Sequence, residues 1–295
     1  MLLVVGSNNN GHIVLSAKRD TCFIRRRMPS FHMNQHIQIL NFQFAILVAS
    51  LVLVSAGNIK ADDGLLRVMT YNIHHCQGTD GRTDIQRIAN VIKTAKADLV
   101  ALQEVDYMTK RSGRIDQAAK LGELCGMKSF FGRAIDYQGG RYGNAVLSKD
   151  AHLEIENLRL PGRGAENRNI LAVSFPLARR LTVTFASTHF DHKSVDARAK
   201  AANFIAKTMP QKRSLMIVAG DLNCSPDSEE LRPLSKMFRS VNEEPLATFP
   251  NRSPKSQIDF ILYDRRSRWS VESVEVIDDG GASDHRPLLA VIKTK

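Results

Sequence analysis

Polar residues of a few chemically useful types recur at the ends of short apolar runs in this sequence. Asn72 ends "VMTYN", Glu104 ends "LVALQE", and His189 follows "VTFAST". Asp221 and Asn223 follow "LMIVAG" within three positions. Asn and Asp are common turn formers, and a single histidine is more often structural than catalytic, so none of these residues is informative alone.

The last part of the chain adds three residues with the same placement. Asp259 begins "DFIL", and the pair Asp284-His285 precedes the final apolar run, "PLLAVI". In layered sheets, loops at one set of strand ends bring side chains from distant segments together on a ligand. Taken as one set, the residues of both groups supply what hydrolysis of a phosphate ester requires.

One requirement is a divalent cation. Mg²⁺ is a hard ion that prefers carboxylate and amide oxygens and takes few of its ligands from protein. The sequence has no cluster of Cys and His of the type that selects zinc. Mg²⁺ is therefore the expected ion, with Mn²⁺ as an alternative and the number of ions left open. The candidate ligands are Asn72, Glu104, Asp221, Asn223 and Asp284.

The other requirement is a group that moves or donates a proton. A histidine beside a carboxylate can polarise or deprotonate water, or donate a hydrogen bond to a phosphoryl oxygen in the transition state. His189 and His285 are the candidates, and Asp259 is the natural carboxylate partner for one of them.

These residues must be positioned by strands and helices that the apolar pattern predicts. The runs of strand length are residues 65–73, 97–105, 142–148, 169–175, 180–188, 214–222, 257–263, 269–277 and 287–292. Helical spacing of apolar residues recurs from Ile85 to Ile92, where Thr83 can cap the helix, and again over 115–124 and 197–205. We expect one α/β domain in which two sheets face each other and helices cover the outsides.

Composition limits the class of protein without identifying its ligand. Hydrophobic residues make up 43% and charged residues 24%, which predicts a folded globular chain. The net charge of +11 divides into +5 for residues 1–61 and +6 for the remainder, a balance that suits a phosphate-bearing substrate or a solvated surface equally. Of four cysteines, three follow residue 61 without CxxC spacing, so neither a disulfide framework nor a zinc knuckle is indicated.

The first 61 residues have the character of a leader preceding a domain at 62–295. Residues 37–59 carry no charge, and the apolar heart, "FAILVASLVLVSA", spans 44–56. That length is typical of a signal-peptide core, whereas a membrane helix needs about 20 apolar residues. A retained membrane anchor and a buried helix are the alternatives. We expect a periplasmic or secreted protein, or a membrane-anchored one if the segment is retained.

Seven segments of the chain resemble, in this order, the endonuclease/exonuclease/phosphatase superfamily with its DNase I-like fold. "LQE", "GDLN" and "SDHRP" are jointly specific, although each is weak alone. The resemblance spans about 66–292 and implies a four-layer α/β sandwich of two mixed β-sheets flanked by helices. The segments are "TYNIHH", "ADLVALQEVD", "YGNAVLSK", "ASTHFDHK", "VAGDLNCSPDS", "QIDFILY" and "GASDHRPLLAVI".

The resemblance also implies roles for single residues near the start and middle of the chain. Asn72 and Glu104 match metal-site residues, with Glu104 as the principal carboxylate ligand. His189 matches a catalytic or phosphate-contacting histidine. Asp221 matches the residue that positions or activates the attacking water, and Asn223 one that binds phosphate or a second metal.

Near the end of the chain, Asp259 is similar to the aspartate that holds the last histidine. His285 resembles that histidine, a general base or transition-state donor, and Asp284 a further metal ligand. Two more residues, Asn144 and Arg168, stand at positions that imply a place near the substrate phosphate.

The substrate is not specified by these shared residues, since members of the superfamily act on nucleic acids, inositol phosphates and sphingomyelin. "YNIHH" and "YGNAVLSK" also resemble small secreted bacterial members and lipid-remodelling proteins, which slightly favours a lipid or small phosphodiester. A secreted nuclease of the same mechanism is the second hypothesis. A non-catalytic, envelope-anchored binding module is the third. Membrane association through the leader is expected only if it is retained, and no protein partner is predicted.

Overall fold

The computed structural model describes residues 4–7, 13–16, 64–178, 181–209 and 214–294. The leader's apolar segment, 44–56, lies outside these residues. Strands β1 (Val4–Ser7) and β2 (Ile13–Ser16) pair in antiparallel fashion and belong to a unit separate from the rest. Within the described ranges, no helix has the length and apolar character needed to cross a membrane.

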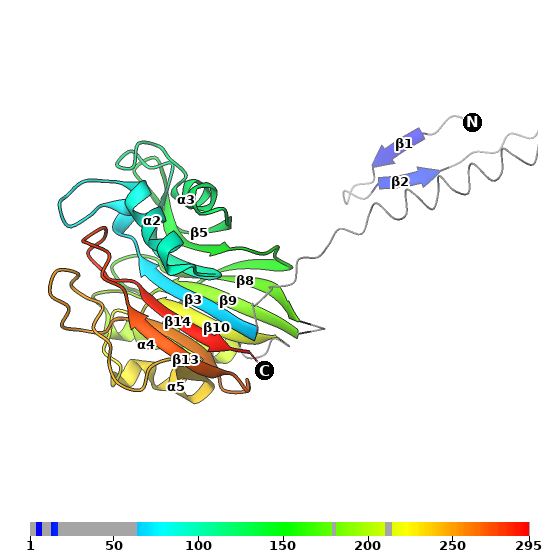
Figure 1. The fold of residues 1–295 in the computed structure, drawn as a ribbon. Coiled ribbons are helices and arrows are strands. Elements are labelled where there is room, and N and C mark those ends of the chain that lie inside the picture. Colours follow the sequence, from blue (N-terminus) through cyan, green and yellow to red (C-terminus); the bar gives the residue numbers. More distant parts are fainter. Residues whose placement is uncertain (1–3, 8–12, 17–63, 179–180, 210–213, 295) are drawn as a thin grey trace, which may run out of the picture. The chain divides into compact units, whose positions relative to one another are not determined.

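The first large sheet of the main unit has six strands in the order β13-β14-β3-β4-β6-β5 (Figure 1). Strands β3 and β4 run parallel, and the other neighbours in this sheet run antiparallel. The strands are β3 (Leu65–Asn72), β4 (Leu99–Tyr107), β5 (Lys128–Tyr137), β6 (Gly140–Ser148), β13 (Ser270–Val276) and β14 (Leu288–Lys293).

The second sheet also has six strands, in the order β11-β12-β10-β9-β8-β7. Its parallel pair is β9–β10, and its other neighbours are antiparallel. Both sheets are therefore mixed, as expected. The strands are β7 (Glu154–Arg159), β8 (Asn169–Ala178), β9 (Leu181–His189), β10 (Leu215–Asp221), β11 (Phe238–Ser240) and β12 (Asp259–Asp264).

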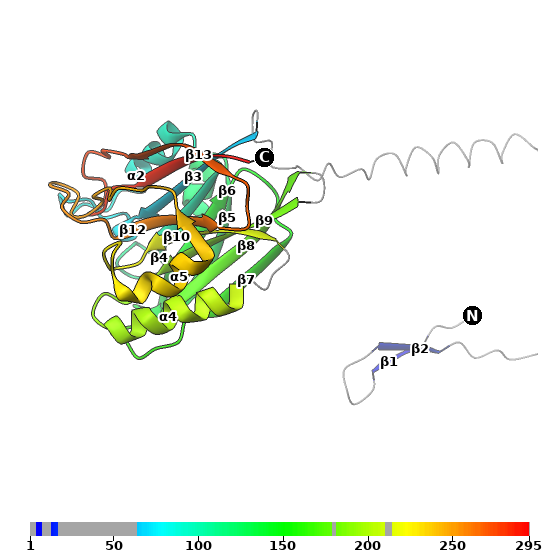
Figure 2. The ribbon, with the colours of Figure 1, turned by 90° about the horizontal axis from the view of Figure 1, so that it is seen from below.

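Helices cover the outer face of each sheet, which makes four layers (Figure 2). Helices α2 (Ile85–Ala95) and α3 (Gln117–Cys125) pack on the first sheet, and α4 (Val195–Thr208) and α5 (Arg232–Met237) on the second. The described residues also include two short 3₁₀ turns, η2 (His74–Cys76) and η4 (Glu229–Leu231).

Three apolar cores fill the spaces between these layers, and each combines side chains from both neighbouring layers. Val68 and Phe185 meet between the two sheets. Ile92 of α2 lies in the core that contains Met69, and Ile205 of α4 lies in the core that contains Val218. The predicted four-layer α/β sandwich is confirmed.

Each predicted helix forms. The expected cap of α2, Thr83, is wrong. Asp84, not Thr83, is the N-cap, because its Oδ1 accepts hydrogen bonds from the backbone N–H groups of Gln86 and Arg87. Ser194 caps α4 in the same manner through the N–H of Ala197.

Strand register brings predicted site residues from separate segments next to one another. In the second sheet Asp221 is paired with His189 on the parallel strand β9 and with Asp259 on the antiparallel strand β12. Position 220 requires glycine, since a Cβ there would lie 1.9 Å from the carbonyl oxygen of Thr188 on the neighbouring strand β9. In the first sheet Asn72 ends β3 beside Gln103 of β4.

Candidate active site

Seven of the ten predicted site residues line one cavity at the ends of the central strands. Its volume is about 360 Å³. Segments separated by up to 181 positions contribute to it, from Glu104 to His285. Besides Glu104, the predicted residues that line it are Arg168, His189, Asp221, Asn223, Asp284 and His285.

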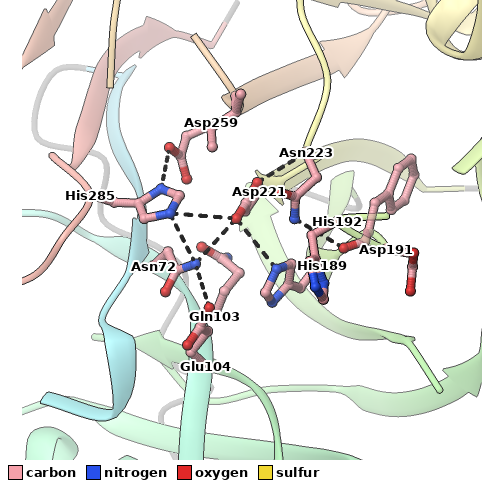
Figure 3. A network of polar contacts seen from close by, with 12 residues as sticks. Asn72, Gln103, Glu104, His189, Asp191, His192, Asp221, Asn223, Asp259 and His285 are labelled. Atoms are coloured by element: carbon pink, nitrogen blue, oxygen red, sulfur yellow. Dashed lines mark hydrogen bonds and ion pairs between the residues drawn. The ribbon is translucent and has the colours of Figure 1, made fainter. Parts of the chain in front are cut away.

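Asp221 is the centre of the polar contacts in this cavity. Figure 3 shows its carboxylate between the rings of His189 and His285. Its Oδ2 lies 3.4 Å from Nε2 of His189 and 3.8 Å from Nε2 of His285, and it accepts a hydrogen bond of 3.2 Å from the amide of Asn72. Only 1% of Asp221 is exposed, and burial raises the pKa of its carboxyl to about 7.

His285 has its own carboxylate partner on the side away from Asp221. Its Nδ1–H donates to Oδ2 of Asp259 over 2.9 Å, and both side chains are buried. Burial disfavours the imidazolium, but the carboxylates of Asp259, Asp221 and Asp284 together outweigh it, and the pKa of His285 rises to about 10. The expected pairing of Asp259 with one of the histidines is therefore present, and His285 is favoured in its protonated form.

Glu104 reaches the cavity because β4 is irregular at that residue. The register with β6 shifts between Leu102 and Val105, and Glu104 has a φ of +60°. A bulge of this kind re-aims a side chain that regular pleating would point elsewhere. Oε1 of Glu104 accepts a hydrogen bond of 3.2 Å from Nδ2 of Asn72, which thus links Glu104 to Asp221.

His189 is held from behind by a cation and not by a carboxylate. Nη1 of Arg168 lies 3.1 Å from Nδ1 of His189, and Nη2 lies 3.3 Å from Nδ1 of His192. Burial, together with the charge of Arg168, places the pKa of His189 well below its usual value. His189 is accordingly neutral, in contrast to His285.

The sequence of the chain also matches a known protein family. The sequence pattern of the Endonuclease/Exonuclease/phosphatase family matches residues 69–285, which include every predicted site residue. The chain belongs to this family. Its members are phosphoester hydrolases and generally use divalent metals.

Individual relatives in the family are distant in sequence but similar in fold. YbhP of Escherichia coli (strain K12), an uncharacterized protein, is 24% identical over 242 residues, 77% of this chain and 95% of YbhP. An endonuclease/exonuclease/phosphatase from Beutenbergia cavernae has a TM-score of 0.65 at 23% identity, covering 78% of this chain and 72% of its own. The Bacteroides thetaiotaomicron mannosyl-6-phosphatase Bt3783 has a TM-score of 0.64 at 19% identity, covering 77% and 99%.

A divalent ion of the kind the family uses fits the donors beside Glu104. Ligand atoms of His74, His75 and Glu104 lie within 4.8 Å of one another, and Nδ1 of His74 is 3.9 Å from the carboxylate of Asp284. Nδ1 of His75 is buried without a hydrogen-bond partner among the described residues. A second group of possible ligands consists of Asp221, Asp259 and His285. These side chains already contact one another, as described above.

This imidazole-containing group was not predicted from sequence. We expected oxygen ligands alone and no histidine cluster, whereas the turn after β3 places His74 and His75 beside Glu104. His74 donates its Nδ1–H to the carbonyl of Gln77, which fixes its ring. The doublet "HH", which follows Asn72 after one intervening residue, was the available signal.

Three predicted residues have surroundings that bear on their expected roles. The amide nitrogen of Asn72 faces the carboxylates, while its oxygen accepts from the backbone N–H of His74. The backbone N–H of Asn223 donates to Oδ1 of Asp221. Asn144 lies between the sheets, is not among the residues lining the cavity, and donates to the side chain and carbonyl of Asn169.

The cavity is also lined by residues to which the sequence analysis gave no role. Arg111 is bound by two hydrogen bonds to the buried carboxylate of Asp106 and lies 4.7 Å from the ring centre of Tyr137. Tyr142 also lines the cavity. Arg111 and Tyr137 come from the loop after β4 and the end of β5, which carried no motif, whereas Tyr142 begins the segment "YGNAVLSK" of β6.

Proposed function

We propose that this protein is an exported, divalent-metal-dependent phosphoester hydrolase that acts on phosphodiesters. The observation that carries the proposal is the position of Asp221. Its carboxylate lies within 4 Å of two differently held histidines, in a cavity that also contains Glu104 and Asp284. That combination supplies a base, hydrogen-bond donors and hard ligands at one place.

The chain's own residues can accept the proton of the attacking water and stabilise the charge that develops on the phosphoryl group. A water oxygen attacks phosphorus while Asp221, whose pKa burial raises to about 7, accepts the proton of that water. The ester P–O bond breaks, and the leaving oxygen takes up a proton from solvent. His285, held as a cation by Asp259, donates to a phosphoryl oxygen on which negative charge develops.

A metal ion would be held by Glu104, His74 and Asp284, with the amide of Asn72 fixing the Glu104 carboxylate. When bound, the ion would neutralise charge on the substrate phosphate and orient it. Mg²⁺ remains the proposed ion with Mn²⁺ as the alternative.

The cavity favours a compact substrate, either a lipid head group or another small phosphodiester. Its volume is at the lower end of the range for small-molecule sites. Tyr137, Tyr142 and Phe249 contribute apolar surface to its lining. A nuclease of the same mechanism is the alternative. Phosphomonoesters also have to be assayed, because the similar Bacteroides protein is a mannosyl-6-phosphatase.

The activity test uses the purified protein with Mg²⁺ or Mn²⁺, with and without EDTA. The substrates are bis-p-nitrophenyl phosphate, p-nitrophenyl phosphate, plasmid DNA and sphingomyelin. Turnover of a diester that EDTA abolishes supports the proposal, and cleavage of DNA alone supports the nuclease. If no substrate is turned over with either ion, the non-catalytic binding module is the better description.

Export is proposed from the leader and tested separately. The expected result is that the mature protein begins after the apolar segment 44–56. N-terminal sequencing of the secreted or periplasmic protein locates that end. A mature chain that still contains residue 40 would contradict cleavage and favour a membrane anchor.

A further inference from the structure

Arg168 occupies an unusual place behind the cavity. It immediately precedes β8, is 8% exposed, and directs its guanidinium toward two imidazole rings. Nη1 lies 3.1 Å from Nδ1 of His189, and Nη2 lies 3.3 Å from Nδ1 of His192. Oε2 of Glu166 lies 3.6 Å from Nη1 and balances part of the charge.

The chemistry of the guanidinium decides the state of both rings. Arginine stays protonated in proteins and has only donors, so Nδ1 of each histidine must accept through its lone pair. A neutral imidazole with an accepting Nδ1 carries its proton on Nε2. In His189 that Nε2 lies 3.4 Å from Oδ2 of Asp221.

We propose that Arg168 is a positioning residue that fixes His189 in the Nε2–H tautomer, so that His189 serves only as a hydrogen-bond donor in the cavity. The ligand of this donor, an anionic oxygen of a phosphoester, rests on the proposed function. The tautomer itself does not. His285 is held in the opposite sense, because its Nδ1–H donates to Asp259.

His192 extends this arrangement toward the substrate. It lines the same cavity, and the same guanidinium holds its Nδ1 as an acceptor. Its Nε2–H is therefore a second donor, and both donors are fixed by one cation. Arg168 thus acts through the two histidines, which differs from the direct phosphate contact that its sequence position implied.

The first test reads the tautomer directly. The full chain is labelled with ¹⁵N-histidine, and long-range ¹H–¹⁵N correlation spectra show which ring nitrogen of each histidine is protonated. His189→Gln and His192→Gln variants assign the two signals among the nine histidines. Protonation of His189 at Nε2 is expected. Protonation at Nδ1 in the folded wild-type protein would overturn the proposal.

Arg168→Met tests whether Arg168 causes this state. Methionine keeps the length of the side chain and removes every donor, so the Nε2–H signal of His189 should give way to a mixture of tautomers. Arg159→Gln is the matched control, because Arg159 is exposed and contacts Asn167. An unchanged His189 signal in folded Arg168→Met would show that another group fixes the ring.

The second test asks what the donor does. The amide nitrogen of Gln can take the place of Nε2, whereas that of Asn lies nearer to Nδ1. His189→Gln should keep kcat within about tenfold of wild type, and His189→Asn should lose on the order of 10²–10³-fold, as when a donor to developing charge is removed. Equal losses in the two variants would contradict a pure donor role.

Failure of the proposed function remains distinguishable from failure of this inference. A protein that turns over no phosphoester but shows Nε2–H at His189 contradicts the function and leaves the tautomer assignment intact. An active, EDTA-sensitive enzyme with Nδ1–H at His189 supports the function and overturns the role of Arg168.

Discussion

The two histidines beside Asp221 differ in the charge of the group behind them. Asp259 contacts Nδ1 of His285, and Arg168 contacts Nδ1 of His189. A carboxylate favours the imidazolium, and a guanidinium favours the neutral ring. Two residues of the same type, both buried within 4 Å of one carboxylate, can therefore perform different tasks in a single turnover.

Asp259→Asn tests the task assigned to His285. The amide keeps the shape of the carboxylate but removes the charge that contributes most to raising the pKa of His285 to about 10. We expect kcat to fall on the order of 10²–10⁴-fold, the usual scale for an acid–base group. Asp196→Asn is the control, since Asp196 forms only an exposed ion pair with Lys200. An Asp259→Asn enzyme with wild-type kcat would rule out a cationic His285.

Glu104→Gln separates metal binding from proton chemistry. Loss of the carboxylate should weaken Mn²⁺ or Mg²⁺ binding about tenfold or more, measured by titration calorimetry, and lower kcat on the order of 10²–10⁴-fold. His285→Ala should lose kcat to a similar extent while it binds the ion as wild type does. Glu123→Gln, at an exposed pair with Lys120, is the control. Unchanged ion affinity in Glu104→Gln would move the metal site elsewhere.

At the scale of elements, the central strands were predictable, whereas most of the edge strands were missed. The nine predicted strand segments correspond to nine strands. Central strands such as β10 are continuously apolar, and such a run can be recognised in the sequence. In the main unit the missed strands are β5, β7 and β11, which all lie at sheet edges, whereas the edge strand β13 was predicted because its sequence alternates between apolar and polar residues. An edge strand faces solvent with much of its surface, so its sequence can be polar, as "EIENLR" of β7 is.

The site was predictable as a set of residues but not as a set of contacts. The order of the motifs identified Asp221, Asp259 and His285. The bulge that aims Glu104 arises from pairing between β4 and β6, some 40 residues apart, and leaves no local pattern. The contact of Arg168 with two histidines likewise depends on how β8 and β9 pair, and on the loop that follows them.

Gly220→Ala tests how tightly the elements fix the site. The added Cβ would lie 1.9 Å from the carbonyl oxygen of Thr188 and force β10 away from β9. We expect a loss of about 1–3 kcal/mol in the free energy of unfolding from urea titration. We also expect kcat to fall about 10²-fold, because Asp221 and His189 lie on the two strands that separate.

Gly126→Ala is the comparison for that substitution. Gly126 ends α3 with a φ of +65° and has open space around its Cα, so alanine should cost about 1 kcal/mol through backbone strain alone. Its kcat should stay at the wild-type value. If both variants lose stability equally and Gly220→Ala keeps its kcat, the close approach of β9 and β10 at Gly220 does not set the catalytic geometry.

At the scale of the whole molecule, the first and last strands of the main unit lie next to each other in one sheet. Strand β3, which begins at Leu65, pairs along its length with β14, the last strand of the chain. The backbone N–H of Thr294 donates to the carbonyl of Gly64 over 2.7 Å, so the pairing of β3 with β14 extends back to residue 64. Every predicted site residue lies between these ends.

A chain of residues 62–295 should therefore fold and act without the leader. Tolerance of a truncation depends on whether it removes buried or hydrogen-bonded backbone, and a cut at residue 62 leaves β3, all three cores and the cavity intact. We expect this truncated chain to have the same urea midpoint and the same turnover rate as the full chain. A second truncation that begins at residue 69 removes half of β3 and should abolish cooperative unfolding. If the chain that begins at residue 62 unfolds at lower urea than the full chain, the leader stabilises the domain, which would contradict its role as a removable segment.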